Sequence, residues 1–425
     1  MCRLFGTSEM VLVEQAGVLP RTLIETLIDD GLVEQVAGGI RGTVQFSDWE
    51  GFVIAHDPSN PLELRENSVS GINPTTRTLA ALTVRRPVGR ALDVGTGCGA
   101  QALLAARHAD EVVATDVNPR ALWLTEINAA LNGLTNITCV EGSLFEPVTG
   151  EKFDLVVGNL PFVISPDSDY TFRDSGLPGD DVSRIAVEGA AAALNEGGYA
   201  HLMCNWALEP GAHWSQRPLE WLSSLECSAW LLYHSSESSR DYAEKWNRAL
   251  LKDRPDDYLN TIERWIAYHN AIGATAVANG AVVLHRDEFG LRRIDRMAVP
   301  PQGNGGGQVE RVFSIAARTD DRHLSDAIAT LVSPHSFRQV LRYQDHQYVA
   351  ADAQLVLDDT AGVVGDVAPL AAHVLLRLDG RRALGEIIEQ TVEETGLDEH
   401  ELLDTTVGVF ADLVHQGVVE VCWPR

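Results

Sequence analysis

The distribution of apolar positions in the middle of the chain predicts strands that alternate with helices. Apolar runs at 91–94, 111–115 and 152–158 have the length and residue types of buried strands. Residues 101–108 form a helical pattern between the first two of these runs. Such alternation is typical of a parallel sheet with helices on both faces. We therefore expect an α/β domain over residues 61–300.

The residues before this domain predict a small module of their own. An amphipathic helical segment covers Leu19–Val36. Two strand-like runs at 42–46 and 51–55 are separated by Ser47–Glu50, which predicts a hairpin. A helix followed by a hairpin is similar to a winged-helix-like α+β domain, and we assign it to residues 1–60.

The residues after the α/β domain predict a linker and a third domain. The proline- and glycine-rich stretch at 300–307 favours a flexible linker, which we assign to residues 301–310. Residues 311–425 contain amphipathic helical patterns at 383–395 and 398–416, flanked by strand-like runs at 354–357 and 418–421. This pattern favours a winged-helix-like or peptide-recognition α+β domain. Because its helices are acidic, we expect docking, dimerisation or peptide binding there.

Composition narrows the class of protein. A length of 425 residues predicts two or three domains, and the apolar fraction of 45% is sufficient for packed cores. No run of about 18 apolar residues is present, and the start of the sequence lacks the pattern of a secretion signal. The 6 cysteines and 13 histidines are scattered without metal-ligand spacing. We therefore predict no metal site, no membrane span, and free thiols in the cytoplasm.

Charge bears on the class of partner. The chain has 60 acidic and 33 basic residues, which gives a net charge of −27. A strongly negative protein is repelled by polyphosphate. Arg292, Arg293 and Arg296 lie together in sequence, but we interpret them as a solvated strand end. A small-molecule, peptide or protein partner is therefore favoured over nucleic acid, and a homodimer is a further candidate assembly.

Glycines and an acid mark a candidate nucleoside site. Gly95, Gly97 and Gly99 follow a predicted strand and precede a predicted helix, so the backbone can approach a ligand closely. Asp116 ends the next strand, about 20 residues later, where an acid accepts hydrogen bonds from a ribose diol. Asp116 as a helix cap is the alternative, although Asn118 is better placed for that cap.

The segment Asn159-Leu160-Pro161-Phe162 carries the candidate chemistry. Asn159 lies just past the carboxyl end of the third predicted strand, where open α/β sheets bind ligands. Its side-chain oxygen and the Leu160 carbonyl can accept two hydrogen bonds from a planar NH2 group, and Phe162 can stack on a flat substrate. An ordinary turn is the alternative. The position behind the glycines and Asp116 favours a catalytic role.

Together these segments resemble the class I S-adenosylmethionine-dependent methyltransferases, which have a Rossmann-like sheet. The branch with Asn-Pro-Pro-Tyr/Phe, which includes HemK-like glutamine methyltransferases and RsmC-like guanine methyltransferases, is most similar, over about residues 60–290. The resemblance rests on Asp93–Gly99, Thr115–Asp116, Gly142–Pro147 and Gly158–Val163.

The resemblance implies roles for individual residues. The glycine loop would contact the methionine part of the cofactor, Asp116 the ribose, and Ser143 and Leu144 the adenine. The complete set of implied cofactor contacts is Asp93, Gly95, Thr96, Gly97, Gly99, Asp116, Val117, Ser143, Leu144, Asn159, Thr76 and Arg77. Two positions depart from the family pattern. Ser143 replaces an acidic residue, and Leu160 replaces a proline, as it also does in rRNA adenine dimethyltransferases.

Two further regions are candidates for ligand contact. In the related branch the segment before the first catalytic strand closes over the cofactor, so Thr76 or Arg77 would reach its carboxylate; a capped helix start is the alternative. The loop at 170–181 contains an aromatic pair, a charge pair and glycines, as a substrate lid does, although it also suits an ordinary surface loop. The candidate substrate contacts are Tyr170, Phe172, Arg173, Asp174 and Trp206.

These features predict an S-adenosylmethionine-dependent N-methyltransferase that acts on a planar amino or amide nitrogen of a small molecule, peptide or protein. Catalysis would consist mostly of alignment, with Asn159, Leu160, Pro161 and Phe162 as the catalytic motif and no dedicated general base. Two alternatives stay open. One is an rRNA base methyltransferase with the same cofactor, and the other is an interaction protein that binds the cofactor without turnover.

Overall fold

The computed structural model describes residues 5–6, 11–12, 20–58, 65–168, 170–316 and 321–423. The chain divides into two compact units. The first comprises residues up to 79 together with 86–225 and 235–286, and the second comprises 80–85, 226–234 and the residues from 287 onward. No boundary between units falls at residue 60, where the sequence predicted one. Within the predicted first domain, residues 1–4, 7–10, 13–19 (including Leu19) and 59–60 lie outside the described residues.

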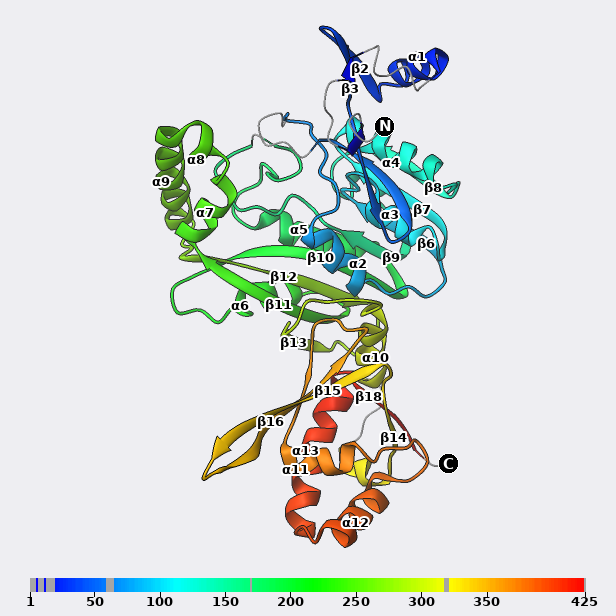
Figure 1. Ribbon diagram of the computed structural model, residues 1–425, viewed down its shortest axis with the longest axis vertical. Helices are drawn as coiled ribbons and strands as arrows, with labels where there is room; N and C mark the ends of the chain where they lie inside the picture. Colours follow the sequence, from blue (N-terminus) through cyan, green and yellow to red (C-terminus); the bar gives the residue numbers. More distant parts are fainter. Residues whose placement is uncertain are drawn as a thin grey trace. The chain divides into compact units, whose positions relative to one another are not determined.

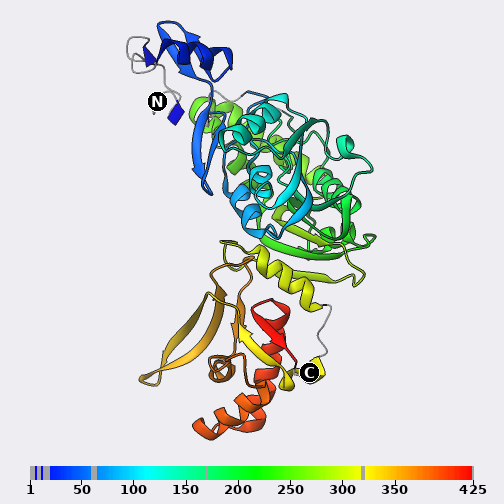
Figure 2. The ribbon, with the colours of Figure 1, turned by 90° about the vertical axis from the view of Figure 1, so that its right-hand side faces the viewer.

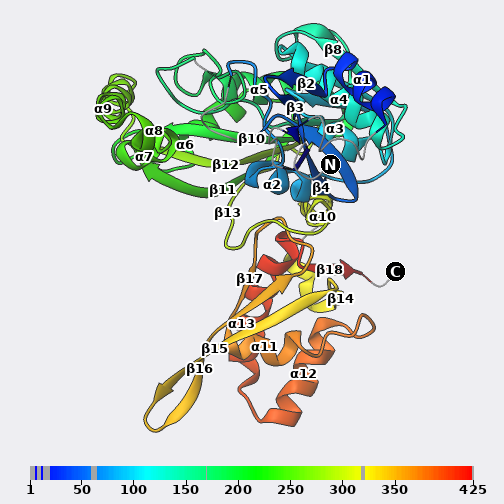
Figure 3. The same cartoon turned by 45° about the horizontal axis from the view of Figure 1, so that its top comes forward.

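An eight-stranded sheet forms the centre of the fold, in the order β13-β11-β12-β10-β9-β6-β7-β8 (Figure 1). Its strands are β6 (Val88–Val94), β7 (Ala109–Asp116), β8 (Ile137–Glu141), β9 (Phe153–Gly158), β10 (Leu194–Leu208), β11 (Ser228–Ser238), β12 (Ala276–His285) and β13 (Arg292–Arg296). The strands β6 to β10 pair in parallel, whereas β12 runs antiparallel to β10. Figure 3 shows β10, β12 and β11 side by side. The predicted Rossmann-like α/β sheet is confirmed.

The order of the strands creates a switch point. From β6 the chain proceeds to β7 and β8 on one side, whereas β9 and β10 lie on the other side of β6. In open α/β sheets, ligands bind outside the carboxyl ends of the strands at such a point. The glycine loop follows β6 and Asn159 follows β9, so these two predicted motifs leave adjacent strands at the same edge.

Helices cover the sheet. They are α2 (Pro74–Leu82), α3 (Ala100–Ala105), α4 (Pro119–Leu131), α5 (Asp181–Ala193) and α6 (Gln216–Leu222). Helix α3 contacts β6 and β7, α4 contacts β7 and β8, and α5 contacts β9 and β10. Helix α4 begins where Asn118 accepts a hydrogen bond of 3.0 Å from the Arg120 amide, with Pro119 in its first turn. Asn118 is therefore the cap, as predicted, and Asp116 is free of that role.

A helical insertion separates β11 from β12. The predicted helical pattern over Arg240–Asn270 corresponds to α7 (Ser239–Asn247), α8 (Leu250–Asp253) and α9 (Pro255–Ala271). Figure 1 shows these helices grouped at one end of the sheet. Their buried face carries Tyr242, Ile262 and Trp265, which pack with Val163 and Ile164 of the loop that follows β9. The insertion therefore supports the segment immediately after the Asn159 motif.

The described N-terminal residues form a helix and two small sheets. Their elements are β1 (Val11–Leu12), α1 (Arg21–Asp29), β2 (Val33–Val36), β3 (Gly39–Gly42), β4 (Gln45–Trp49) and β5 (Phe52–His56). The predicted hairpin is present as β4 and β5. Its turn differs from the predicted Ser47–Glu50, because Ser47 continues β4. Glu50 and Gly51 close the turn with φ of 55° and 74°, the conformation that a two-residue hairpin turn requires.

Two asparagines attach this hairpin to helix α4. The side chain of Asn128 accepts from the Ala55 amide (2.7 Å) and donates to the Ala55 carbonyl (2.9 Å). Asn132, one helical turn later, makes the same pair of bonds with Val53, at 3.0 and 2.9 Å. Each asparagine side chain thus makes the pair of backbone hydrogen bonds that a residue of a neighbouring strand would make. The hairpin consequently belongs to the first compact unit rather than to a separate domain.

The second unit contains a helical cluster and two further small sheets. Its remaining elements are α10 (Gly306–Ala316), β14 (Ile328–Leu331), β15 (His335–Gln344), β16 (Gln347–Leu357), β17 (Gly365–Val367), α11 (Pro369–Leu375), α12 (Leu384–Thr395), α13 (Glu399–His415) and β18 (Val419–Cys422). Helices α12 and α13 match the predicted helical patterns within two residues. Strands β15 and β16 form a long hairpin that projects from the helices of this unit (Figure 2). A winged-helix-like assignment of this unit stays a prediction.

The glycine-rich stretch predicted as a flexible linker is packed instead. Gln302 pairs with Thr360 through two backbone hydrogen bonds, of 3.0 and 3.1 Å. A Cβ atom on Gly305 would lie 2.3 Å from the Thr360 carbonyl oxygen, and one on Gly306 would lie 2.2 Å from that of Thr83. The glycines therefore permit close approach of backbones. Composition alone could not distinguish this use of glycine from flexibility.

Among the described residues, no helix is both long and apolar enough to cross a bilayer.

Candidate active site

A cavity of about 1200 Å³ opens in the first unit at the switch point of the sheet. It is lined by the glycine loop, by the residues that follow β7, β8 and β9, and by parts of α5 and α7. The predicted site residues that line it are Thr76, Asp93, Gly95, Thr96, Gly97, Asp116, Val117, Ser143, Leu144, Asn159, Leu160, Pro161, Phe162, Phe172 and Arg173. Most of the predicted site therefore surrounds one cavity.

The glycine loop reaches this cavity through left-handed backbone conformations. Gly95, Gly97 and Gly99 have φ of 68°, 57° and 80°, which side chains other than glycine rarely adopt. A Cβ atom on Gly95 would lie 2.7 Å from Leu160 Cδ2, and one on Gly99 would lie 2.9 Å from Thr125. Gly95 thus lets the loop pack directly against the Asn159 motif. Gly99 lies at the start of α3, behind the cavity wall.

Asp116 holds the glycine loop in place. Its Oδ2 accepts a hydrogen bond of 3.0 Å from the Gly97 amide, and its Oδ1 accepts one of 2.9 Å from the Asn118 amide. Burial raises the pKa of Asp116, while these two bonds act in the opposite direction. A carboxylate has about four lone-pair positions, so each oxygen can still accept a hydrogen bond from a ligand hydroxyl. Asp116 can therefore shape the loop and bind a ribose at the same time.

Asp93 is buried beneath the loop. Its Oδ2 accepts from the Thr96 hydroxyl (2.7 Å) and from the Ala102 amide (3.0 Å). Burial raises its pKa to about 7, against the opposing effect of these two bonds. The side chain therefore joins the end of β6 to the start of α3. A nearby cationic ligand would favour its ionised form.

The predicted adenine side is built by the residues after β8. Leu144 has a φ of 49°, and its carbonyl accepts a hydrogen bond of 3.4 Å from the Thr115 hydroxyl. Ser143 is exposed at the cavity. Phe145 also lines the cavity, and a Cβ atom on Gly189 of α5 would lie 2.3 Å from its ring. The glycine in α5 therefore makes room for an aromatic wall, a role that sequence analysis did not assign to either residue.

Asn159 presents an unsatisfied acceptor. Its Oδ1 is enclosed by protein, yet it accepts no hydrogen bond from any described residue. An unpaired buried acceptor costs about 1–3 kcal/mol, so the fold retains it against a penalty. The Leu160 carbonyl accepts from the Phe162 amide at 2.8 Å and keeps one lone pair free. The two acceptors predicted to orient an NH2 group thus both retain capacity for a further hydrogen bond.

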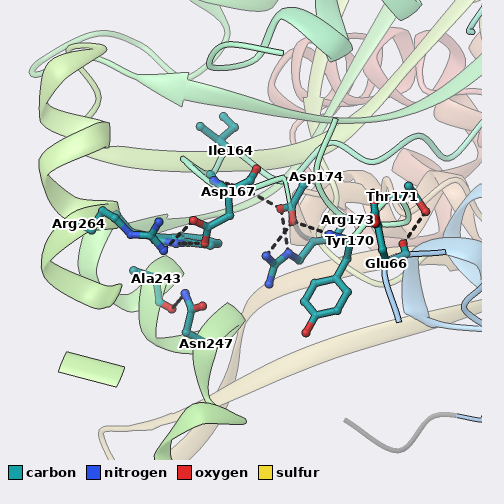
Figure 4. Close-up of polar contacts among 12 residues, drawn as sticks. Glu66, Ile164, Asp167, Tyr170, Thr171, Arg173, Asp174, Ala243, Asn247 and Arg264 are labelled. Carbon is teal, nitrogen blue, oxygen red and sulfur yellow. Dashed lines mark hydrogen bonds and ion pairs between the residues drawn. The ribbon is translucent and has the colours of Figure 1, made fainter. Parts of the chain in front are cut away.

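The loop after this motif is held by the helical insertion. The Ile164 amide donates to Tyr242 Oη (3.2 Å), and the Ile164 carbonyl contacts His269 Nε2 (2.9 Å). Asp167 accepts from Trp265 Nε1 (2.8 Å). It also pairs with Arg264 (2.7 Å), as Figure 4 shows. These partners are about 80 to 105 residues apart in sequence, as is usual for tertiary contacts. The insertion therefore adds tertiary contacts that hold this loop.

The predicted substrate contacts divide into two groups. Phe172 and Arg173 line the cavity, whereas Tyr170 and Asp174 lie behind them and pair with Arg173 through a ring contact and an ion pair. Trp206 is fully buried in the core, where its Nε1 donates to the Trp214 carbonyl at 2.7 Å, and it does not line the cavity. An aromatic residue in a central strand is buried from both faces of the sheet.

The two candidate ligand contacts before β6, Thr76 and Arg77, also differ in whether they line the cavity. Asn73 caps α2, because its side chain accepts from the amide and the hydroxyl of Thr76, both at 2.9 Å. Thr76 is thus part of a capped helix start, and it also lines the cavity. Its carbonyl accepts from Gln101 Nε2 of α3 at 2.9 Å. Arg77 is exposed and lies outside the lining.

Helix α7 contributes residues that sequence analysis missed. Lys245 and Trp246 line the cavity, and Lys245 Nζ pairs with Glu237 at 2.8 Å. Their spacing suits any solvated helix face, so the sequence held no signal for this role. Only the return of the chain after β11 brings them to the motif that follows β9.

Comparison with known proteins agrees with this geometry. Residues 68–210 match the family model described as the methyltransferase small domain. This segment, about a third of the chain, is similar to that domain. The parallel sheet with its switch point and the glycine loop agree with the class I resemblance, which implies S-adenosylmethionine as the cofactor.

Curated relatives are similar to part of this chain. Release factor glutamine methyltransferases of Xylella fastidiosa (strain Temecula1) and Deinococcus radiodurans are 38% and 45% identical over 129 and 123 residues. These regions cover 28% and 26% of this chain and 47% and 43% of the relatives. The ribosomal protein L11 methyltransferase of Lactobacillus delbrueckii subsp. bulgaricus is 36% identical over 118 residues, 27% of this chain and 37% of that protein. The chain thus spans less than half the length of these relatives.

Proposed function

We propose that the protein is an S-adenosylmethionine-dependent N-methyltransferase whose acceptor is an amide or amino nitrogen presented by a peptide or protein. The observation that carries the proposal is the unsatisfied Oδ1 of Asn159, at the carboxyl end of β9 and beside the glycine loop. A planar NH2 group supplies the donor that this oxygen lacks, and the Leu160 carbonyl accepts the second hydrogen.

The residues present fit the cofactor. Bound S-adenosylmethionine supplies an electrophilic methyl group. The positive φ of Gly95 and Gly97 allows close approach to a ligand, and Asp116 keeps lone pairs for ribose hydroxyls. Ser143, at the adenine side, offers a hydroxyl where an acid is common. This substitution weakens one adenine contact without blocking the pocket.

Alignment of the acceptor is then the principal catalytic contribution of the chain. Asn159 and Leu160 orient the nitrogen lone pair, and Phe162 packs on the flat group. Holding reactants in an attack geometry can supply about 7–11 kcal/mol of the barrier. The Asn159 oxygen also stabilises positive charge that develops on the nitrogen. Water can accept the proton that the nitrogen releases afterwards.

Two observations favour a peptide or protein over RNA. The net charge of −27 opposes binding to a polyphosphate. Curated relatives that match part of the chain are named for methylation of a release factor or a ribosomal protein. Five described cysteines are free thiols, which is consistent with the predicted cytoplasmic location. The homodimer stays a prediction that light scattering can test.

The test is a methyl-transfer assay with isotope-labelled S-adenosylmethionine. Acceptors are tested in parallel: a peptide library with glutamine and asparagine side chains, total cellular protein, and total RNA. Label on peptide or protein nitrogen that Asn159→Ala abolishes would support the proposal, with mass spectrometry locating the methyl group. Label on RNA alone would favour the rRNA alternative. Cofactor binding without any transfer would favour the interaction protein without turnover.

A further inference from the structure

Arg173 and Asp174 form a buried ion pair beside the acceptor cavity. Of these two described residues, only Arg173 lines the cavity. Its Nε and Nη2 donate to the two carboxylate oxygens of Asp174, at 2.9 and 2.8 Å. The exposed fractions of the two side chains are 9% and 0%. The guanidinium carbon also lies 5.0 Å from the centre of the Tyr170 ring and 5.7 Å from that of Trp265. The guanidinium is therefore fixed in position and orientation.

Asp174 has no capacity left for a ligand. Besides the two bonds from Arg173, it accepts from the Ser165 hydroxyl at 2.9 Å and from the Tyr170 amide at 3.3 Å. These four donors occupy the roughly four lone-pair positions of a carboxylate. Asp174 is therefore a positioning residue for Arg173, and not the substrate contact that the sequence predicted. Figure 4 shows its carboxylate turned toward Arg173 and the loop backbone.

Arg173, in contrast, retains donors. A guanidinium carries five N–H bonds, and Asp174 uses one on Nε and one on Nη2. The side-on pairing directs Nη1 away from Asp174. The three remaining N–H bonds have no partner among the described residues, and Arg173 lines the cavity. Arg173, with these remaining donors, and Asn159 thus line the same cavity.

The net charge of the Arg173–Asp174 pair selects the class of ligand. Arg173 and Asp174 together are neutral, and Lys245, another cation of the lining, is paired with Glu237. A carboxylate bound to Arg173 would leave one uncompensated negative charge in a largely buried place, which is costly. A neutral carbonyl oxygen accepts the same hydrogen bonds without adding charge.

We propose that Arg173 determines acceptor specificity by binding a neutral backbone carbonyl oxygen that flanks the methylated amide side chain, while Asn159 holds the nitrogen to be methylated. The acceptor is then an amide-bearing peptide segment rather than a free acid or an isolated amine. This inference rests on the proposed function, since it places the carbonyl relative to the reacting nitrogen. A hydrogen bond from a charged donor to a neutral acceptor changes affinity by about ten- to a hundredfold.

The test compares the affinities of two probes in the presence of saturating S-adenosylhomocysteine, by ligand-detected NMR titration. Butyramide carries only the primary amide, whereas N-acetyl-L-glutamine methylamide carries the same amide with flanking neutral carbonyls. Arg173→Lys keeps the charge that balances Asp174 but replaces the three nitrogens of the planar guanidinium with a single ammonium nitrogen. The double variant R173M/D174N removes both charges, so that no buried charge is left unpaired. Arg264→Met is the matched control, because Arg264 holds the same loop through Asp167 and does not line the cavity.

We expect the wild type to bind the methylamide at least about tenfold more tightly than butyramide. Both Arg173 variants should lose that advantage and leave the affinity for butyramide unchanged, and Arg264→Met should change neither. Equal losses for both probes would show a merely structural role and overturn the inference. Tighter binding of N-acetyl-L-glutamine, with its free carboxylate, or of adenosine would also overturn it. If the expected affinities are found but no methyl group is transferred to the methylamide, the proposed function fails and the carbonyl site stands.

Discussion

The Gly97 amide donates a hydrogen bond of 3.0 Å to Oδ2 of Asp116, which joins the two motifs that sequence analysis had treated as separate cofactor contacts. Gly97 lies after β6 and Asp116 ends β7, so the bond closes the gap between the carboxyl ends of two adjacent strands. The acid therefore shapes the loop against which the cofactor binds. A change at Asp116 removes both the direct contact and the shape of the loop.

Asp116→Ala should lower the affinity for S-adenosylhomocysteine by about ten- to a hundredfold, the effect of losing hydrogen bonds to a charged group. Asp116→Asn should also weaken binding, because one of its atoms becomes an NH2 group facing the Gly97 or the Asn118 amide. Calorimetric titration measures both. Asp110→Ala, at the exposed beginning of the same strand, is the control and should bind as the wild type does. Unchanged affinity in Asp116→Ala would exclude a ribose at this position.

Asn159→Ala should separate cofactor binding from transfer. The side chain contributes no hydrogen bond to the described protein through Oδ1, so its removal should leave folding and cofactor affinity nearly unchanged. The rate constant kcat should fall by about 10²–10³, as when one preorganised group is removed from a site of developing charge. Steady-state kinetics with the acceptor identified by the labelling assay measures the loss. Retention of full kcat would remove Asn159 from the mechanism.

Local sequence was sufficient for the parts of the fold that depend on one strand and its next turn. The strands β6, β7 and β9, the glycine loop and the cap at Asn118 follow from residues that are neighbours in sequence. The clamp on Ile164 and Asp167 by helices α7 and α9 does not, because the contacts join segments about 80 to 105 residues apart. No local pattern encodes such a pairing.

Glycine was the residue type whose meaning the sequence left most ambiguous. The triplet at 95–99 was correctly interpreted as a tight turn, since a strand precedes it and a helix follows it. The run at 303–307 was interpreted as a linker, yet Gly305 and Gly306 are packed against the backbone of Thr360 and Thr83. Only a partner that is distant in sequence distinguishes close packing from flexibility.

Gly95→Ala should reduce cofactor affinity and kcat by more than the strain of its backbone conformation alone would. The residue has a φ of 68°, in which a Cβ atom costs about 1–2 kcal/mol. The added Cβ atom would also lie 2.7 Å from Leu160 Cδ2 and would displace the Asn159 motif. We expect a loss of cofactor affinity together with a loss of kcat.

Gly133→Ala is the matched control for this change. Gly133 also has a φ of 68°, but a Cβ atom there meets no atom within 4 Å. It should therefore show the cost in the free energy of unfolding without a change in cofactor affinity. Equal effects of the two variants on affinity would show that the contact with Leu160 is unimportant.

Gly306→Ala should destabilise the second unit. Its Cβ atom would lie 2.2 Å from the Thr83 carbonyl oxygen, so a backbone segment must move, at a cost of about 1–3 kcal/mol. Gly307→Ala, one position later in α10, meets Arg311 at an ordinary 3.5 Å and should stabilise the helix by about 0.5–1 kcal/mol. Thermal unfolding of both variants distinguishes a packed segment from a linker, in which both changes would be nearly neutral.

Asp93 should make the stability of the first unit depend on pH. Burial raises its pKa in the folded state to about 7 from an ordinary value of 3.8, so the folded protein holds this proton more tightly than the unfolded chain does. Between these values the contribution of Asp93 to stability falls as the pH rises, by at most about 1.4 kcal/mol per pH unit, and above about 7 the loss is complete. Asp93→Asn should remove this contribution, because an amide oxygen can accept the same two bonds from Thr96 and Ala102.

The free energy of unfolding of the wild type and of Asp93→Asn, measured by denaturant titration from pH 5 to pH 8, isolates this contribution from the many other carboxylates. The variant should gain stability relative to the wild type as the pH rises, and the difference should level off above pH 7. A cationic cofactor favours the ionised form of Asp93, so S-adenosylmethionine should displace a proton when it binds near pH 7. Calorimetry in buffers of different ionisation enthalpy would detect that proton in the wild type and a smaller release in the variant. A difference in stability that does not vary with pH would mean that Asp93 titrates in its ordinary range, and that its role is limited to the two hydrogen bonds.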